Sequence, residues 1–409
     1  MKKIIAALLV ISMLFCLAAC KQDAASNDQT VATTTSELTK NTEITEDTEP
    51  VINDIIPEQA PMAAVSLPVS VTESYTEDDV LLFTYRCQTI SLIIPDAEIE
   101  DKVIIDFQNR LDDFSESAQS LNLQSQNDYK SASNWNPYFF NILYSPTRID
   151  HAVLSMFGNN ISWAGGAHPT HNCTSANYDL ITGDVLTLGS ILTHEDALDD
   201  LCGLLIDSVA EIKAEKFIMS DYEDTIRTRL IQNESYNEAW YFDNNGINFY
   251  FSPYEIAPYS SGVITVNIPY EKLVGIIEDR YFPPESDVTT GTIKAIKHAD
   301  ADAAQFTQIA EIIIDKEGEM IFLYTDKSVQ NVSIEYGYWN DSQTVFSTQC
   351  TVFATPCLTP GDAAMIQLSS SDAPPCVRLK YESNQETIVE YIVLNQDNGS
   401  ILLLKENDI

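Results

Sequence analysis

One motif in the sequence has side chains suited to metal binding or catalysis. It contains two histidines that are three residues apart. The motif SWAGGAHPTH occupies residues 162–171 and contains His168 and His171, and two imidazoles at such spacing can bind one zinc ion. Pro169 separates the two histidines, so the segment is expected to be a loop and not a helix. The sequence does not identify a third zinc ligand. A packed or hydrogen-bonded loop histidine is therefore the alternative to a metal site.

Trp163 and the pair Gly165-Gly166 belong to the same motif. An indole can stack on a sugar ring or on a neighbouring aromatic side chain. The two glycines allow the backbone to adopt positive φ angles or to come close to a ligand. We therefore place Trp163 and His168 among the candidate ligand-binding residues.

A second stretch, residues 240–268, carries aromatic side chains on a loop that contains two prolines. Apolar and polar residues alternate over 247–252 and again over 264–268, which predicts two half-buried strands. Between them, Pro253 and Pro258 each fix one φ angle. The loop presents three further candidate ligand-binding residues: Tyr254, Glu255 and Tyr259. Rigid loops rich in tyrosine lose little entropy on binding and serve well as contact surfaces. The alternative is a sheet corner filled by these rings.

No motif of a familiar enzyme class occurs elsewhere in the sequence. There is no GxSxG elbow, Walker loop or HExxH motif, and 61 Asp and Glu residues are too many to nominate a catalytic pair. The acidic residues from His298 to Asp302 lack the glycine and distal glutamate of an EF-hand loop, which favours a solvated surface. We therefore expect a binding protein without a cofactor. A metal-dependent hydrolase of the cell envelope that uses His168 and His171 is the alternative.

Amphipathic helices are expected to support these loops. After Asp96, apolar residues recur every three or four positions, which predicts a helix with one buried face. That face comprises Ile99, Val103, Phe107, Leu111, Phe114, Ala118 and Leu121. Further helices are expected from a capping box at Thr193 and Asp196 to Ile212, from Ser220 to Leu230, and from Leu273 to Tyr281.

Strands joined largely by hairpins accompany the helices. They are expected over 80–92, 137–143 and 151–157, with a turn at residues 158–160. This pattern predicts an α+β fold in which helices pack on an antiparallel sheet. Residues 288–409 show short strands and one weakly helical segment around residues 300–309. They predict a small, β-rich, sandwich-like C-terminal domain.

The N-terminus has the pattern of an exported lipoprotein. A basic pair precedes an apolar run that ends in the letters LAAC at Cys20, which resembles a lipobox. We expect residues 1–19 to be a signal peptide. We expect Cys20 to carry lipid that holds the chain on the extracytoplasmic face of the cell membrane. Residues 20–65 are expected to form a disordered acidic tether, because residues 21–65 contain nine acidic and two basic residues and are poor in aromatic ones.

The chain is strongly acidic, with a net charge of −39 at pH 7. Without residues 1–19, which contain two lysines, the charge is −41 (20 minus 61), of which residues 66–287 contribute −24 (11 minus 35). Such a field repels nucleic acid and anionic lipid, and it speeds the capture of cationic proteins. Solubility outside the cell is the other explanation for this charge.

Six cysteines remain after Cys16 and Cys20 are set aside. They are Cys87, Cys173, Cys202, Cys350, Cys357 and Cys376. Disulfides can form outside the cell, but the sequence leaves their pairing open. No CxxC spacing indicates a redox or metal site.

Three motifs taken together resemble one family. They are WAGGAHP at residues 163–169, DLITGDVLTL at 179–188 and GINFYFSPYEIAPYSSG at 246–262. They resemble the exported pair of domains of unknown function that is found ahead of the catalytic domain in PdaC-type peptidoglycan deacetylases and as the lysozyme-binding ectodomain of RsiV-type anti-sigma factors. The resemblance implies a small α+β module at 66–160 and a larger α+β domain at 161–285.

Neither deacetylase activity nor signalling by membrane proteolysis carries over from this resemblance. The chain shows no deacetylase domain with metal-binding Asp and His motifs, and no spanning helix with a cytoplasmic anti-sigma segment. We expect instead a non-catalytic cell-surface lipoprotein that binds a cationic protein, with lysozyme implied by the resemblance, or peptidoglycan. No nucleic-acid partner is expected. The hypothesis requires the segments 163–171 and 253–259 to fold next to each other with their rings exposed.

Overall fold

The described part of the chain is an α+β fold, as predicted, with several sheets, a few helices and an all-β C-terminal region. The computed structural model describes residues 69–406 except 77, 89–93, 95, 195, 233–238, 284–289, 303–304, 315–316, 341–344, 369–375 and 396–398. These residues belong to one compact unit, 56–409. The expected signal peptide, Cys20 and the tether lie outside the described residues. Among the described helices, none combines the length and apolarity needed to cross a membrane.

Five strands form the first sheet, in the order β1-β2-β3-β4-β5. The pairing of β2 with β3 is parallel and the other pairings are antiparallel. The strands are β1 (Val69–Tyr75), β2 (Leu81–Gln88), β3 (Tyr138–Ile149), β4 (Val153–Trp163) and β5 (Thr170–Asp179). β1 is not among the strands predicted from the sequence.

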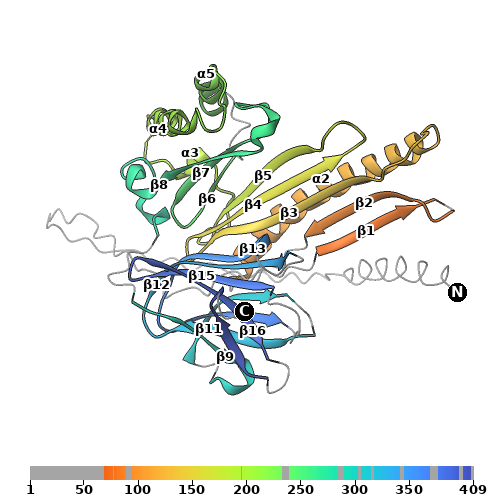
Figure 1. Cartoon of the computed structure of the whole chain (residues 1–409). Helices are drawn as coiled ribbons and strands as arrows, with labels where there is room; N and C mark the ends of the chain where they lie inside the picture. Colours follow the sequence, from red (N-terminus) through yellow and green to blue (C-terminus); the bar gives the residue numbers. More distant parts are fainter. Residues whose placement is uncertain are drawn as a thin grey trace, which may run out of the picture. The chain divides into compact units, whose positions relative to one another are not determined.

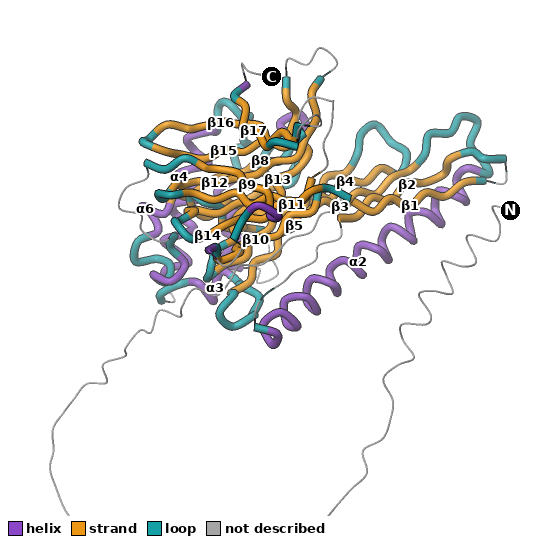
Figure 2. The backbone as a smooth tube through the Cα atoms, turned by 90° about the horizontal axis from the view of Figure 1, so that it is seen from below, coloured by secondary structure: helices purple, strands orange, loops and turns teal. Residues whose placement is uncertain are grey.

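A long helix, α2 (Ala97–Tyr129), runs along the first sheet (Figures 1 and 2). The side chain of Asp96 caps its N-terminus by accepting hydrogen bonds from the backbone N–H groups of Glu98 and Ile99. The predicted apolar face is confirmed, because four of its residues are buried and the other three are half-buried against the same core. The buried ones are Val103, Phe107, Leu111 and Ala118.

The turn predicted at residues 158–160 is wrong, because β4 passes straight through them. Gly158 is needed there for packing and not for a turn. A Cβ on Gly158 would lie 2.6 Å from Cγ2 of Thr174 and 2.8 Å from Cε1 of Tyr144. As a result, the boundary expected between modules at residue 160 falls inside a strand of the first sheet.

A three-stranded antiparallel sheet, β6-β7-β8, follows the first sheet in sequence. Figure 1 shows helices α4 and α5 on one side of it. The strands are β6 (Trp240–Phe242), β7 (Gly246–Phe251) and β8 (Ile264–Pro269). The helices are α3 (Leu188–Ile191), α4 (Ala197–Ile212), α5 (Tyr222–Arg227) with the π-helix η1 (Thr228–Gln232), η3 (Tyr259–Ser261), α6 (Tyr270–Leu273) and η4 (Asp279–Tyr281).

Three local predictions for this region are corrected by the structure. All of β7 is buried, so it is not the half-buried strand expected. The helix expected from Leu273 to Tyr281 is interrupted because Gly275 adopts a φ of +81°. The capping box forms one helix earlier, between Thr187 and Ser190, while the hydroxyl of Thr193 donates a hydrogen bond to the carbonyl of Gly275.

The C-terminal region forms two sheets with the orders β10-β14-β11-β9 and β13-β12-β15-β16-β17. The helical segment expected around residues 300–309 is wrong for residues 307–309, which belong to β10, and in its described part only short 3₁₀ turns precede that strand, such as η5 (His298–Asp300). The strands are β9 (Ile293–Lys297), β10 (Thr307–Ile313), β11 (Glu319–Thr325), β12 (Val329–Trp339), β13 (Phe346–Leu358), β14 (Asp362–Leu368), β15 (Val377–Ser383), β16 (Glu386–Leu394) and β17 (Ile401–Leu404).

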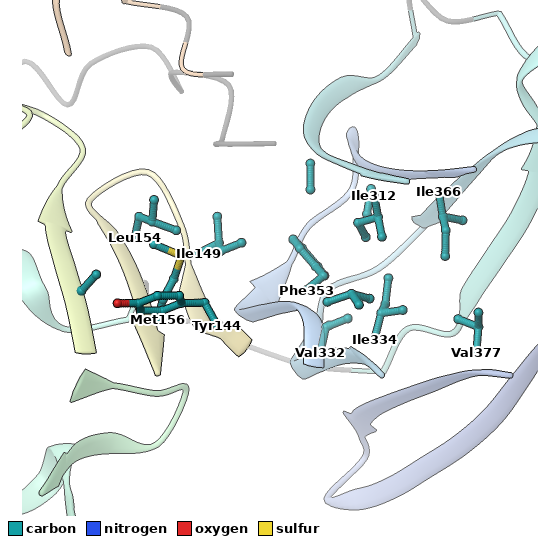
Figure 3. Packing of buried hydrophobic residues seen from close by; sticks show 14 of the residues in the cluster. Tyr144, Ile149, Leu154, Met156, Ile312, Val332, Ile334, Phe353, Ile366 and Val377 are labelled. Carbon is teal, nitrogen blue, oxygen red and sulfur yellow. The ribbon is translucent and has the colours of Figure 1, made fainter. Parts of the chain in front are cut away.

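One hydrophobic core joins the first sheet to the C-terminal region. Figure 3 shows Tyr144 and Met156 of the first sheet in the same cluster as Phe353 of β13 and Ile334 of β12, all of them almost completely buried. Each such buried side chain stabilises the folded protein by roughly 1.5–3 kcal/mol. The two parts of the chain therefore stabilise each other.

No disulfide joins the cysteines of the described residues. Burial raises the pKa of the thiols of Cys173, to about 12, and of Cys350, to about 11. Both thiols are therefore protonated at physiological pH.

Candidate functional site

The two segments singled out in the sequence lie against each other. The imidazole of His168, in the loop between β4 and β5, stacks on the ring of Tyr259, in the connection between β7 and β8. Their centroids are 3.8 Å apart and their planes are 24° apart. The hydroxyl of Tyr259 also donates a hydrogen bond of 3.0 Å to the carbonyl of Pro169. We call His168, Tyr254 and Tyr259 the aromatic surface.

The aromatic surface is accessible to solvent. His168 is exposed, Tyr254 is 60% exposed and Tyr259 is half-buried. The hydroxyl of Tyr254 lies 3.4 Å from Nε2 of His168, and the centroids of Tyr254 and Tyr259 are 5.7 Å apart. The three side chains therefore form one exposed cluster rather than the filled sheet corner that was the alternative.

The loop that carries Tyr254 is held by its own backbone and by the core. The N–H of Tyr254 donates to the carbonyl of Ala257 at 2.9 Å, and the N–H of Glu255 donates to the carbonyl of Ser252 at 3.0 Å. Ile256 and Ala257 are each only 1% exposed and belong to the core beneath the loop. Tyr254 itself has a φ of +74°, a conformation that is unfavourable for a bulky residue.

Glu255 supports this loop instead of facing solvent. Its carboxylate accepts a hydrogen bond of 2.9 Å from the N–H of Ser252 and lies 2.6 Å from the guanidinium of Arg229. That guanidinium also stands over the ring of Phe251, 4.7 Å from its centroid. Burial raises the pKa of the Glu255 carboxyl above its ordinary value, and Arg229 opposes this effect.

Trp163 belongs to a different set of aromatic contacts. Its indole N–H donates to the carbonyl of Gly166 at 3.2 Å, and its ring packs edge-on against Tyr138, with centroids 5.7 Å apart. Tyr138 in turn stacks on Trp135 at 5.0 Å. The expected positive φ occurs at Gly165, at +76°. Trp163 thus fastens the base of the loop that carries His168.

Both ring nitrogens of His168 have polar neighbours. Nδ1 lies 3.1 Å from the carbonyl oxygen of Pro169, and Nε2 lies near the hydroxyl of Tyr254. His171 is half-buried, and its ring centroid is 6.0 Å from that of Tyr259. Within the described ranges of the chain, no three His, Cys, Asp or Glu side chains are grouped so that they could hold a metal ion.

Sequence reasoning missed the residues that hold these loops in place. No local sequence pattern identifies Arg229 as a supporting residue, because its partner Glu255 lies on a distant loop and the two meet only in the folded protein. Trp135 and Tyr138 offered a weak signal, since two aromatic residues flank Asn136 and Pro137 ahead of an expected strand. Such a pattern does not reveal that Trp163 is the third ring.

Two solved structures of DUF3298 proteins are similar to this chain. One, from Bacteroides fragilis NCTC 9343, is 19% identical with a TM-score of 0.41, and the match covers 55% of this chain and 96% of that one. The other, from Pseudomonas aeruginosa PAO1, is 18% identical with a TM-score of 0.31, and the match covers 54% and 98%.

No curated protein matches the chain significantly. A family model described as "Protein of unknown function (DUF3298)" matches residues 192–271. This segment contains α4, α5 and the sheet β6-β7-β8, and thus the loop that carries Tyr254 and Tyr259. The similarity to the DUF3298 family model is therefore confined to residues 192–271 of this protein.

Proposed function

We propose that this protein is a non-catalytic, membrane-anchored binding protein whose aromatic surface docks a cationic protein of the lysozyme type. The observation that carries the proposal is the state of Tyr254, which is 60% exposed and has a φ of +74°. A bulky residue in this conformation costs of order 1–3 kcal/mol. An exposed ring recovers little of that cost by packing, so its position is better explained by a contact with a partner.

The stacking within the aromatic surface supports the same function. His168 and Tyr259 stack on each other, and Tyr254 stands on a loop fixed by backbone hydrogen bonds. Rigid rings of this kind supply contact area without a large loss of side-chain entropy. Aromatic residues are also the side chains that most often dominate binding energy in protein interfaces.

The charge of the chain favours a cationic partner over a glycan. Residues 66–287 carry a net charge of −24, and a field of this sign speeds the encounter with a basic protein. Neutral sugar rings gain nothing from such a field. Cell-wall glycan is therefore the second ligand class, and it rests on the stacking capacity of the rings alone.

The proposal is tested with the compact unit, residues 56–409. Its binding to hen egg-white lysozyme and to insoluble peptidoglycan is measured at 20 mM and 300 mM NaCl, next to a Tyr254→Ala variant. We expect lysozyme binding that weakens with salt and that the variant reduces. Binding to peptidoglycan alone would replace the protein partner by a glycan. Absence of lysozyme binding at 20 mM NaCl would remove the proposed function.

The same proposal places the protein at the extracytoplasmic face of the cell membrane, anchored by lipid on Cys20. It is supported by the lipobox-like sequence that ends at Cys20 and by the acidic, aromatic-poor composition of residues 21–65. This position would present the aromatic surface to proteins that attack the cell wall.

A further inference from the structure

A second aromatic side chain has the same unusual combination of features as Tyr254. Phe217, in the connection between α4 and α5, is 72% exposed and has a φ of +55°. Six non-glycine residues of the described chain have positive φ, and four of them are Asp, Asn or Gln. Phe217 and Tyr254 are the two aromatic ones. In each, an unfavourable backbone conformation holds a ring that is largely exposed.

The loops that carry these two rings are joined by hydrogen bonds. The N–H of Met219 donates to the carbonyl of Ile256 at 2.8 Å, and the hydroxyl of Ser261 donates to the carbonyl of Lys216 at 2.8 Å. Phe217 precedes Met219 by two residues, and Tyr254 precedes Ile256 by two. The two exposed rings are therefore carried on adjoining loops.

The loop around Phe217 is held firmly at its base. Ile218 is only 7% exposed and belongs to the core under the three-stranded sheet. Its N–H donates to the carbonyl of Lys213 at 3.0 Å, and the N–H of Lys216 donates to the carbonyl of Ile212 at 3.0 Å. The exposure of Phe217 is thus a property of a fixed loop, since the next residue is anchored in the core.

Acidic residues are frequent near Phe217 in the sequence. The exposed acidic residues within ten positions of it are Asp207, Glu211, Glu215, Asp221, Glu223 and Asp224. The nearby lysines are engaged, because the ammonium of Lys213 lies 4.6 Å from the ring centroid of Tyr222 and that of Lys216 lies 3.3 Å from the carboxylate of Glu215. An exposed apolar ring in an acidic stretch of the chain is complementary to a basic protein surface that contains an apolar depression.

We propose that Phe217 is an apolar anchor of the docking surface, which extends from His168, Tyr254 and Tyr259 onto the connection between α4 and α5 and accepts a cationic protein. This inference rests on the proposed function and adds a second contact element to it. Phe217 fills an apolar pocket of the partner, while the carboxylates near it in the chain face the basic residues at the edge of that pocket.

The test compares Phe217→Gly with wild type in residues 56–409, with hen egg-white lysozyme as the probe. Glycine accepts positive φ, so the variant removes the ring without straining the backbone. The matched control is Tyr338→Ala, which removes a 61% exposed ring from β12. We expect Phe217→Gly to weaken lysozyme binding roughly 10- to 100-fold and Tyr338→Ala to leave it unchanged. Urea unfolding establishes that both variants are folded.

Salt and a second probe separate the apolar contact from the charge. The fold-loss caused by Phe217→Gly is expected to be the same at 20 mM and 300 mM NaCl, because apolar burial is not screened. Binding to poly-L-lysine, which has the charge but no pocket, is expected to be unaffected by the variant. A Phe217→Gly protein that binds lysozyme within about twofold of wild type, while Tyr254→Ala loses binding, would overturn this inference and leave the proposed function standing. Failure of the wild type to bind lysozyme would overturn both.

Discussion

The ring of His168 lies flat against the ring of Tyr259, 3.8 Å from centroid to centroid, although the two residues lie in loops that connect strands of different sheets. The contact joins the loop between β4 and β5 of the first sheet to the connection between β7 and β8, within the segment that matches the DUF3298 model. Because the hydroxyl of Tyr259 also donates a hydrogen bond to the carbonyl of Pro169, contacts within the chain hold the aromatic surface together. A preassembled surface loses less entropy on binding than one that must be ordered by its ligand.

Replacement of His168 by alanine is expected to weaken lysozyme binding by about 1–2 kcal/mol, or roughly 5- to 30-fold. The free energy of unfolding should change by less than about 1 kcal/mol, because His168 is exposed and its contact with Tyr259 lies at the surface. Calorimetric titration and urea unfolding measure the two effects. His194→Ala, at another exposed histidine, is the control, and an equal loss of binding there would argue against a specific role for His168.

Replacement of Tyr254 separates backbone strain from binding. Tyr254→Ala keeps a side chain at a φ of +74°, whereas Tyr254→Gly relieves that strain. We expect both variants to lose binding about 10-fold, and the glycine variant to be more stable than the alanine variant by about 1 kcal/mol. Urea unfolding of the two proteins under identical conditions checks the second statement. Equal stability of the two variants would mean that the strain at Tyr254 is absent in solution.

Replacement of Arg229 by methionine tests the support under the loop. The variant leaves the carboxylate of Glu255 in a half-buried place without its cation, and we expect a loss of up to about 3 kcal/mol in the free energy of unfolding at pH 7.

The effect of Arg229→Met depends on pH through Glu255. The pKa of Glu255 is raised in the folded protein, so its ionised form costs stability once the pH rises through that pKa, and this cost is absent below the unfolded pKa. Removal of Arg229 raises the folded pKa further. The destabilisation should therefore shrink as the pH falls from 7 to 4. A loss of stability that is constant over this range would show that Arg229 acts by packing on Phe251 alone.

Alanine substitutions at Gly158, within β4, and at Gly166, in the loop after β4, test how closely β4 is packed at Gly158. Gly158→Ala is expected to destabilise the protein by about 1–3 kcal/mol, because its Cβ would collide with Thr174 and Tyr144. Gly166→Ala should change stability by less than about 0.5 kcal/mol, since a Cβ there meets nothing within 4 Å. Thermal unfolding of the two variants compares them directly. Equal effects would contradict the close packing at Gly158.

Cys20→Ser should abolish lipid attachment and shift the protein from the membrane fraction to the soluble fraction, because the acyl chains supply the membrane affinity. Cell fractionation and incorporation of labelled fatty acid measure this. Cys16→Ser, within the expected signal peptide, is the control and should leave lipidation intact. Membrane retention of unlipidated Cys20→Ser would show that another anchor exists.

Local patterns in the sequence were sufficient for much of the fold. The helix after Asp96 and its buried face are confirmed, because a 3.6-residue period of apolar residues reports directly on which side of a helix is covered. The all-β character of the C-terminal region was also predicted, from its short strand-like runs. The turn predicted at Gly158 was wrong. A glycine beside asparagines is typical of a turn, but here the glycine leaves room for the side chains of Thr174 and Tyr144.

By itself, the sequence determined the α+β character of the chain, its strong negative charge and the residues that could form a contact surface, because composition and periodicity are properties of neighbouring residues. Only the tertiary structure decided which of those residues meet. Packing turned Glu255 inward to Arg229, placed Trp163 against Tyr138, and set the loop of Phe217 beside the loop of Tyr254. Such long-range partners depend on how the sheets pack and on backbone hydrogen bonds between distant loops, which leave no periodic trace in the chain.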